Sequence, residues 1–122
     1  MEIKESTRGD VVVLTLTSET ISGPEVSDFH DKVKGLIRDG FKKVVVDLGN
    51  VKWFGSAMLG VLVASLTTLR NASGDLRLAN VAKRVDSIFA VTQLASLFST
   101  YESLDRAVSS YVVKPIESKP AN

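Results

Sequence analysis

An uncharged stretch from Trp53 to Leu69 constrains this chain more than any other segment. It follows the apolar run Val44-Val45-Val46, which is typical of a strand buried on both faces of a sheet. The leucines and valines after Ser56 recur at helical spacing, so this stretch is predicted to form a helix. A helix with no charge on any face is either buried in a core or bound to another molecule. We therefore expect a strand, a short loop and an apolar helix at the centre of the fold.

The rest of the chain alternates between strand and helix patterns. Strands separated by helices form sheets with parallel pairs that the helices cover. The expected fold class is therefore α/β, with a mixed β-sheet of about four to five strands packed with about four helices. Residues 1–113 are expected to form a single domain, and residues 114–122, with two prolines, a disordered C-terminal tail. Strands are predicted at Ile3–Ser6, Val11–Leu16, Phe41–Leu48, Leu76–Ala79 and Leu97–Tyr101, and helices after caps at Ser22, Ser56, Asn80 and Ser103.

Composition argues against several classes of function. The formal net charge is +1, with both signs spread along the chain, so no surface for nucleic acid is expected. The chain has no cysteine and one histidine, which argues against a metal site, and no cofactor is expected. The N-terminus lacks the apolar core of a signal peptide, and the longest apolar stretch, Ala57–Leu66, is too short to span a bilayer. A cytoplasmic protein without membrane insertion is expected.

The polar residues do not form a catalytic set. His30 lies beside Phe29 in a helical pattern, which is typical of a boundary position, and a triad would need a positioned nucleophile and carboxylate as well. Asp47 ends the buried strand without a second carboxylate close to it, and its neighbours are ordinary turn residues. Neither GxGxxG nor a Walker loop is present. The chain is therefore expected not to be an enzyme.

Ser56 stands at the predicted start of the uncharged helix. As an N-cap, its side chain would accept a backbone N–H bond worth about 1 kcal/mol. A helix N-terminus is also where a phosphate is best tolerated electrostatically, and there it would be most disruptive to a partner. The adjacent face, formed by Ala57, Val61, Ala64 and Thr68, is small and uncharged. Such a face fits either close approach by another helix or deeper burial within the domain.

Two spaced motifs resemble a known family. The pattern Val-Val-Val-Asp-Leu-x-x-Val, a short loop, and then Ser-x-x-Leu-Gly-Val-Leu is similar to the STAS domain (sulfate transporter and anti-sigma factor antagonist) over nearly the whole chain. The resemblance implies a cytoplasmic anti-sigma factor antagonist that binds an anti-sigma factor serine kinase. In stand-alone bacterial members the kinase phosphorylates a serine at this helix N-terminus and a serine phosphatase restores it, which assigns phosphorylation to Ser56. The partner-binding residues implied in this way are Gly55, Ser56, Ala57, Met58, Gly60 and Val61.

The neighbours of Ser56 depart from the usual family motif, Asp-Ser-Ser/Thr-Gly-Leu-Gly. Gly55 replaces the acidic residue, Ala57 the second hydroxyl and Met58 the first glycine. Met58 is expected to place a large side chain on the surface that meets the partner. An alternative function is therefore a STAS scaffold or transporter-associated binding subunit that is not phosphorylated. The uncharged helix face also suits a second copy of the chain, so a homodimer is a further alternative, and small-molecule binding ranks last.

Overall fold

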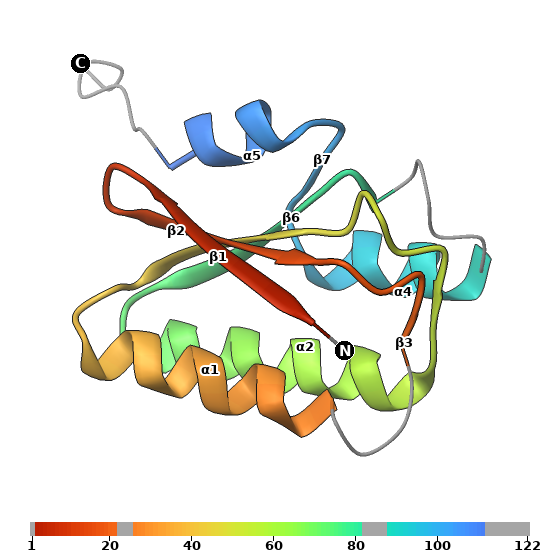
Figure 1. The fold of residues 1–122 in the computed structure, drawn as a ribbon, viewed down its shortest axis with the longest axis horizontal. Coiled ribbons are helices and arrows are strands. Elements are labelled where there is room, and N and C mark those ends of the chain that lie inside the picture. The colour runs from red at the N-terminus through yellow and green to blue at the C-terminus, as the bar shows by residue number, and fades with distance from the viewer. Residues whose placement is uncertain (1, 22–25, 82–87, 112–122) are drawn as a thin grey trace.

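The computed structural model describes residues 2–21, 26–81 and 88–111, which form a sheet covered by helices (Figure 1). Among these residues, five strands form the main sheet in the order β1-β2-β4-β6-β7. The edge strand β1 pairs antiparallel with β2, and the other neighbouring strands are parallel. The predicted α/β class with a mixed sheet is confirmed. The strands are β1 (Ile3–Arg8), β2 (Val11–Leu16), β4 (Lys43–Asp47), β6 (Asp75–Ala79) and β7 (Thr100–Tyr101).

Helices cover both faces of the main sheet. Helix α1 (Ser27–Arg38) and helix α2 (Ser56–Asn71) lie side by side on one face, whereas α5 (Leu104–Ser109) lies on the other (Figure 1). Helix α4 (Ile88–Leu97) contacts α2 before the chain returns to the sheet as β7. These four helices, counted over the described residues, agree with the expected number.

The core follows from the two-residue period of the strands, which sends successive side chains to opposite faces. Val44 and Val46 of β4 belong to the large hydrophobic cluster that includes α1 and α2. Val45 points to the other face, where it joins a smaller cluster with Ala107 of α5. All three valines of β4 are fully buried, as their unbroken apolar run predicts.

Local signals set the ends of two helices. Gly40 follows α1 with a φ of 96°, the left-handed conformation expected of a residue just past a helix end. Ser103 is the N-cap of α5, and its Oγ accepts the backbone N–H of Arg106 at 3.1 Å, as predicted. The cap predicted at Ser22 and the tail predicted over residues 114–122 both lie outside the described residues.

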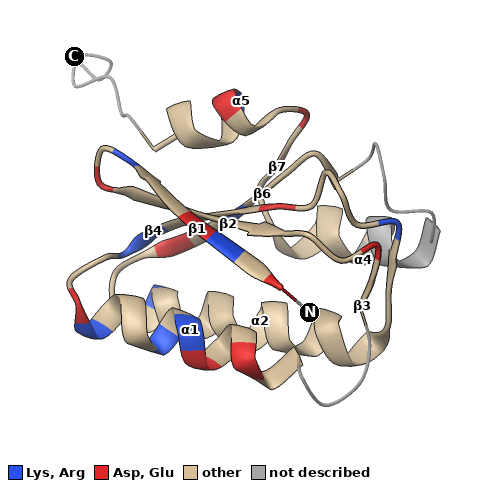
Figure 2. Ribbon diagram, viewed as in Figure 1, with Lys and Arg blue, Asp and Glu red and all other residues tan. Residues whose placement is uncertain are grey.

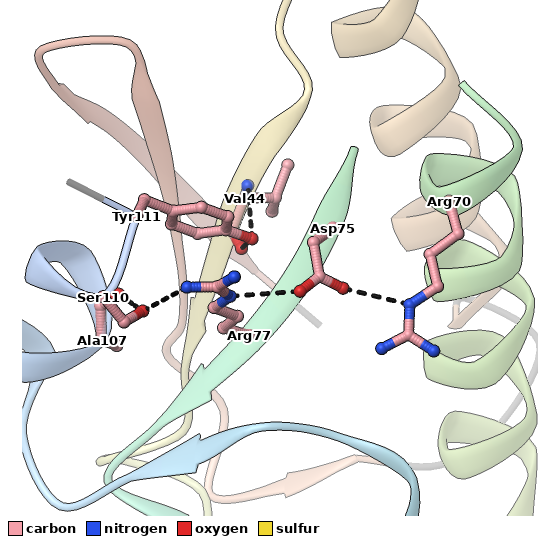
Figure 3. A network of polar contacts seen from close by, with 7 residues as sticks. All are labelled: Val44, Arg70, Asp75, Arg77, Ala107, Ser110 and Tyr111. Carbon is pink, nitrogen blue, oxygen red and sulfur yellow. Dashed lines mark hydrogen bonds and ion pairs between the residues drawn. The ribbon is translucent and has the colours of Figure 1, made fainter. Parts of the chain in front are cut away.

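A polar network fastens the C-terminal part of the domain to the sheet (Figure 3). The hydroxyl of Tyr111 donates to the Val44 carbonyl at 2.9 Å and accepts the Val44 N–H at 3.3 Å. Burial raises the pKa of Tyr111, and the nearby Asp75 carboxylate raises it further. The guanidinium of Arg77 lies 4.0 Å from the centre of the Tyr111 ring and donates to Ser110 at 2.7 Å and to Asp75 at 3.1 Å. These contacts hold α5, Ser110 and Tyr111 against β4 and β6.

Candidate functional site

A two-stranded parallel sheet holds the loop that precedes α2. Strand β3 (Thr20–Ile21) pairs with strand β5 (Trp53–Phe54). The carbonyl of Glu19 accepts the first N–H of β5 at 3.1 Å, and the Gly55 N–H donates to the carbonyl of Ile21 at 3.0 Å. These bonds fix the backbone before and after β5, so α2 starts from a defined position.

Ser56 is the first residue of α2 rather than its N-cap, so the predicted cap is wrong. The N-cap is Gly55, whose extended backbone (φ −86°, ψ 179°) places its carbonyl to accept the N–H groups of Met58 and Leu59 at 3.1 and 3.3 Å. Because Ser56 already has helical geometry, its hydroxyl is not placed to cap the helix. The residue is exposed, and its hydroxyl has no hydrogen bond within the part of the chain that the structure describes. The fold therefore leaves this hydroxyl available to another molecule.

Met58 lies in the core rather than on the surface, which corrects the expectation that its side chain meets a partner. It is fully buried in the large hydrophobic cluster. The helix is rotated so that Met58, Leu62 and Leu69 share the buried face, because side chains three and four residues apart lie on one side of a helix. The other residues predicted to bind the partner reach the surface. Ser56, Ala57 and Gly60 are exposed, and Gly55 and Val61 are half-buried.

Helix α1 packs beside α2 and is joined to its C-terminal part by a side-chain contact. The Nε2 atom of His30 lies 2.9 Å from the hydroxyl oxygen of Thr68, which joins the beginning of α1 to the end of α2. The two helices run side by side in the same direction, and the start of α2 lies beyond the start of α1 (Figure 1). The small, uncharged face of α2 was expected either to meet another molecule or to be buried within the domain. Both occur: Thr68 contacts α1, whereas Ala57 is exposed.

Trp53 is a surface residue outside the set of partner-binding residues expected from the sequence. The residue is 42% exposed, and among the described residues Leu97 is the other exposed large hydrophobic residue. A Cβ added to Gly55 would lie 3.3 Å from Cη2 of the indole, so the ring lies against the glycine that precedes Ser56. The sequence contained one signal for this residue, a lone tryptophan two residues before a glycine. The contact between its ring and Gly55 follows only from the local fold. We define the Ser56 surface as Trp53, Gly55, Ser56, Ala57 and Gly60.

The Ser56 surface contains no charged side chain. The first turn of α2 has no acidic residue, and the charged residue of this helix is Arg70, in the last turn. Charged residues gather instead on α1 and along β1 (Figure 2). Beside the surface, Lys52 forms an ion pair with Glu19 at 3.6 Å. A partner can therefore cover the Ser56 surface without removing an ion from water, which would be costly.

Asp47 has the structural role expected of a strand end. Its Oδ1 atom accepts hydrogen bonds from the Gly49 N–H and from Nδ2 of Asn80, both at 2.9 Å, and so joins the ends of β4 and β6. Of the helix predicted after Asn80, residues 82–87 lie outside the described residues. Within the described ranges, no group of three His, Asp or Glu side chains could hold a metal ion. No described helix combines the length and hydropathy needed to cross a membrane.

The serine at the start of α2 stands where the resemblance of the motifs places it. A family model for the STAS domain matches residues 2–107. The chain belongs to the STAS domain family. The predicted STAS fold is thereby confirmed.

Several STAS proteins are similar to this chain. The anti-sigma-B factor antagonist of Staphylococcus aureus is 26% identical over 80 residues, which cover 66% of this chain and 74% of that protein. An anti-sigma factor antagonist from Mycobacterium paratuberculosis has a TM-score of 0.74 at 21% identity, covering 92% of this chain and 94% of the other. The anti-sigma factor antagonist SpoIIAA, in its unphosphorylated form, has a TM-score of 0.72 at 13% identity, covering 91% and 97%. The SpoIIAA of Bacillus has also been solved in a phosphorylated form.

Proposed function

We propose that this chain is an anti-sigma factor antagonist that binds an anti-sigma factor serine kinase through the Ser56 surface. In this proposal the kinase phosphorylates Ser56 and is released, and a serine phosphatase restores binding. The observation that carries the proposal is the Ser56 hydroxyl, exposed at the first residue of α2 and not used by the fold. The names of the Staphylococcus aureus relative and of SpoIIAA, which occurs in phosphorylated and unphosphorylated forms, support it.

Gly60 supports a partner at this surface independently of Ser56. A Cβ at this position would meet no atom within 4 Å, so the fold does not need a glycine here. A glycine inside a helix is less stable than an alanine by about 0.5–1 kcal/mol. A destabilising glycine on the exposed side of α2, about one turn after Ser56, fits a helix that another molecule approaches closely.

A phosphate on Ser56 would act on binding more than on folding. It would add a charge of about −1.5 to −2 at the N-terminus of α2, where the helix dipole favours an anion by about 0.3–1 kcal/mol. Covered by an uncharged partner surface, the same group would lose its hydration at a cost of several kcal/mol. Since about 1.4 kcal/mol is tenfold in affinity, phosphorylation would release the partner while the domain stays folded.

Phosphate transfer is tested with the purified anti-sigma factor kinases of the source organism, ATP and intact-mass measurement. We expect one phosphate on the wild-type chain and none on Ser56→Ala. Thr20→Ala is a matched control, because Thr20 is an exposed hydroxyl on the neighbouring strand β3, and this variant should accept phosphate like the wild type. Absence of phosphate from the wild type, or equal phosphate on Ser56→Ala, contradicts the proposed modification.

A constitutive binding module is the second candidate function. It is favoured by Gly55 and Ala57, which leave Ser56 without the polar neighbours of the family motif. The chain would then be a STAS scaffold or a transporter-associated subunit, with Ser56 as part of the contact surface. Titration calorimetry with Ser56→Asp separates the two candidates: a constitutive module keeps its affinity, whereas a phosphorylation switch loses it with Ser56→Asp and keeps it with Ser56→Ala.

A further inference from the structure

We propose that Trp53 is the side chain that anchors the protein partner, and that Gly55 provides the space in which its indole is held. This inference rests on the proposed function, because the partner is the anti-sigma factor kinase. Trp53 and Leu97 are the two exposed large hydrophobic side chains of the described residues, at 42% and 44% exposure. Tryptophan is enriched, and leucine depleted, among the side chains that dominate binding at protein interfaces.

The backbone of Trp53 is held before any partner binds. Its N–H donates to the carbonyl of Glu19 at 3.1 Å, and the residue pairs with Thr20 between β5 and β3. The next residue, Phe54, is buried, so the alternation of the strand directs Trp53 outward. A rigid aromatic side chain loses little conformational entropy on binding. Trp53 is therefore arranged in advance for a partner.

Gly55 allows the indole to lie close to the start of α2. A Cβ on Gly55 would lie 3.3 Å from Cη2 and 3.9 Å from Cζ2 and Cζ3 of Trp53. The φ of Gly55 is −86°, a value that any residue adopts, so backbone conformation does not explain the glycine. The explanation is space: a Cβ at position 55 would press on the edge of the indole, and the ring would have to shift by a few tenths of an ångström.

The charges around Trp53 indicate the chemistry of the partner. Ala57 and Gly60 are uncharged, and the ions at the rim, Lys52 and Glu19, pair with each other at 3.6 Å. A charged group of the partner would lose water here without finding a counter-charge in the described surface. The complementary surface of the partner is therefore an uncharged apolar pocket that receives the indole. When the indole is bound, the backbone of the partner lies close to Ala57 and Gly60.

The anchor is tested by titrating the purified anti-sigma factor kinase into wild type, Trp53→Ala and the matched control Leu97→Ala. We expect Trp53→Ala to weaken binding about 30-fold or more, as for a binding hot spot. Leu97→Ala should change the affinity by no more than about twofold, because Leu97 lies at the end of α4 and is not part of the Ser56 surface. Thermal melting followed by circular dichroism shows whether both variants are folded. Unchanged affinity of folded Trp53→Ala overturns the proposal.

The role of Gly55 has a readout that does not depend on the partner. Because the chain contains one tryptophan, labelling with 5-fluorotryptophan gives a single fluorine signal in nuclear magnetic resonance. Gly55→Ala should shift that signal in the free protein, since the new Cβ lies against the ring. The same substitution should weaken binding in the wild type but not in the Trp53→Ala background. An unmoved signal, or equal loss in both backgrounds, overturns the role of Gly55.

Failure of this inference differs from failure of the proposed function. If the wild-type chain binds none of the kinases, the proposed function fails and the inference fails with it. If the wild type binds and folded Trp53→Ala binds equally well, only the anchor is refuted. Light scattering measures self-association in parallel. Loss of a dimer in Trp53→Ala, with kinase binding unchanged, would make the Ser56 surface an interface between copies and overturn the proposal.

Discussion

Replacing Met58 distinguishes a core residue from a partner contact. Its side chain is fully buried, so Met58→Ala removes the apolar equivalent of about three methylene groups from the core, a loss of about 2.4 kcal/mol. The residual cavity adds about 24 cal/mol per Å³, which raises the expected loss of unfolding free energy to about 3–3.5 kcal/mol. The matched variant Met58→Leu nearly conserves volume, and we expect it to cost less than about 1.5 kcal/mol.

Urea unfolding at neutral pH measures both variants. Far-ultraviolet circular dichroism follows the helices, and fluorescence follows Trp53, the one tryptophan of the chain. Coincident transitions by the two probes support two-state unfolding, so the free energies of the two variants can be compared. Under conditions where Met58→Ala is still folded, its affinity for the partner should equal that of the wild type, because the side chain does not reach the surface.

The opposite pattern would refute this reasoning. A loss of less than about 1 kcal/mol for Met58→Ala is below the range for truncating a buried methionine. If that small loss came with abolished partner binding, Met58 would be a surface contact, as the sequence pattern first suggested. The rotation of α2 about its axis would then differ from one that buries Met58, Leu62 and Leu69.

Three other substitutions test separate parts of the structure. Tyr111→Phe removes two hydrogen bonds to Val44 and should cost about 1–2 kcal/mol in urea unfolding. Because burial raises the pKa of Tyr111 in the folded state, wild-type stability should fall as pH rises above about 10, where the unfolded phenol ionises, and the variant should show a shallower fall. Ser103→Ala should cost about 1 kcal/mol by loss of the α5 cap, whereas Ser109→Ala, an exposed serine of the same helix, should stay within about 0.5 kcal/mol in the same assay. Gly60→Ala should stabilise the fold by about 0.5–1 kcal/mol yet weaken partner binding in calorimetry, and unchanged binding would remove Gly60 from the Ser56 surface.

Features that depend on neighbouring residues were predictable from the sequence. The run from Val44 to Val46 predicts a strand buried on both faces, because an unbroken run of β-branched apolar residues is typical of such a strand. Ser103 predicts a helix cap correctly, because the capping bond reaches a backbone N–H three residues later. The STAS motif places the start of α2 within one residue of its observed position.

Features that depend on pairing between distant segments were not predictable in the same way. Gly55 is the N-cap because β5 pairs with β3, and the bond from the Gly55 N–H to Ile21 fixes its extended backbone. The burial of Met58 depends on the rotation of α2 against the sheet and its neighbouring helices, which the periodicity of an almost wholly apolar helix does not define. The position of the Trp53 ring against Gly55 follows from the same strand pairing.

The central claim is that an unmodified Ser56 surface binds the anti-sigma factor kinase and that a phosphate on Ser56 ends this binding. It is tested most directly by producing the chain with phosphoserine installed at position 56 and titrating the purified kinase into the modified and unmodified forms. We predict matching circular dichroism spectra for the two forms, and an affinity of the phosphorylated form that is lower by about 100-fold or more, since the hydration lost by the phosphate costs several kcal/mol. Equal affinities for a kinase that binds the unmodified chain would contradict the proposed switch.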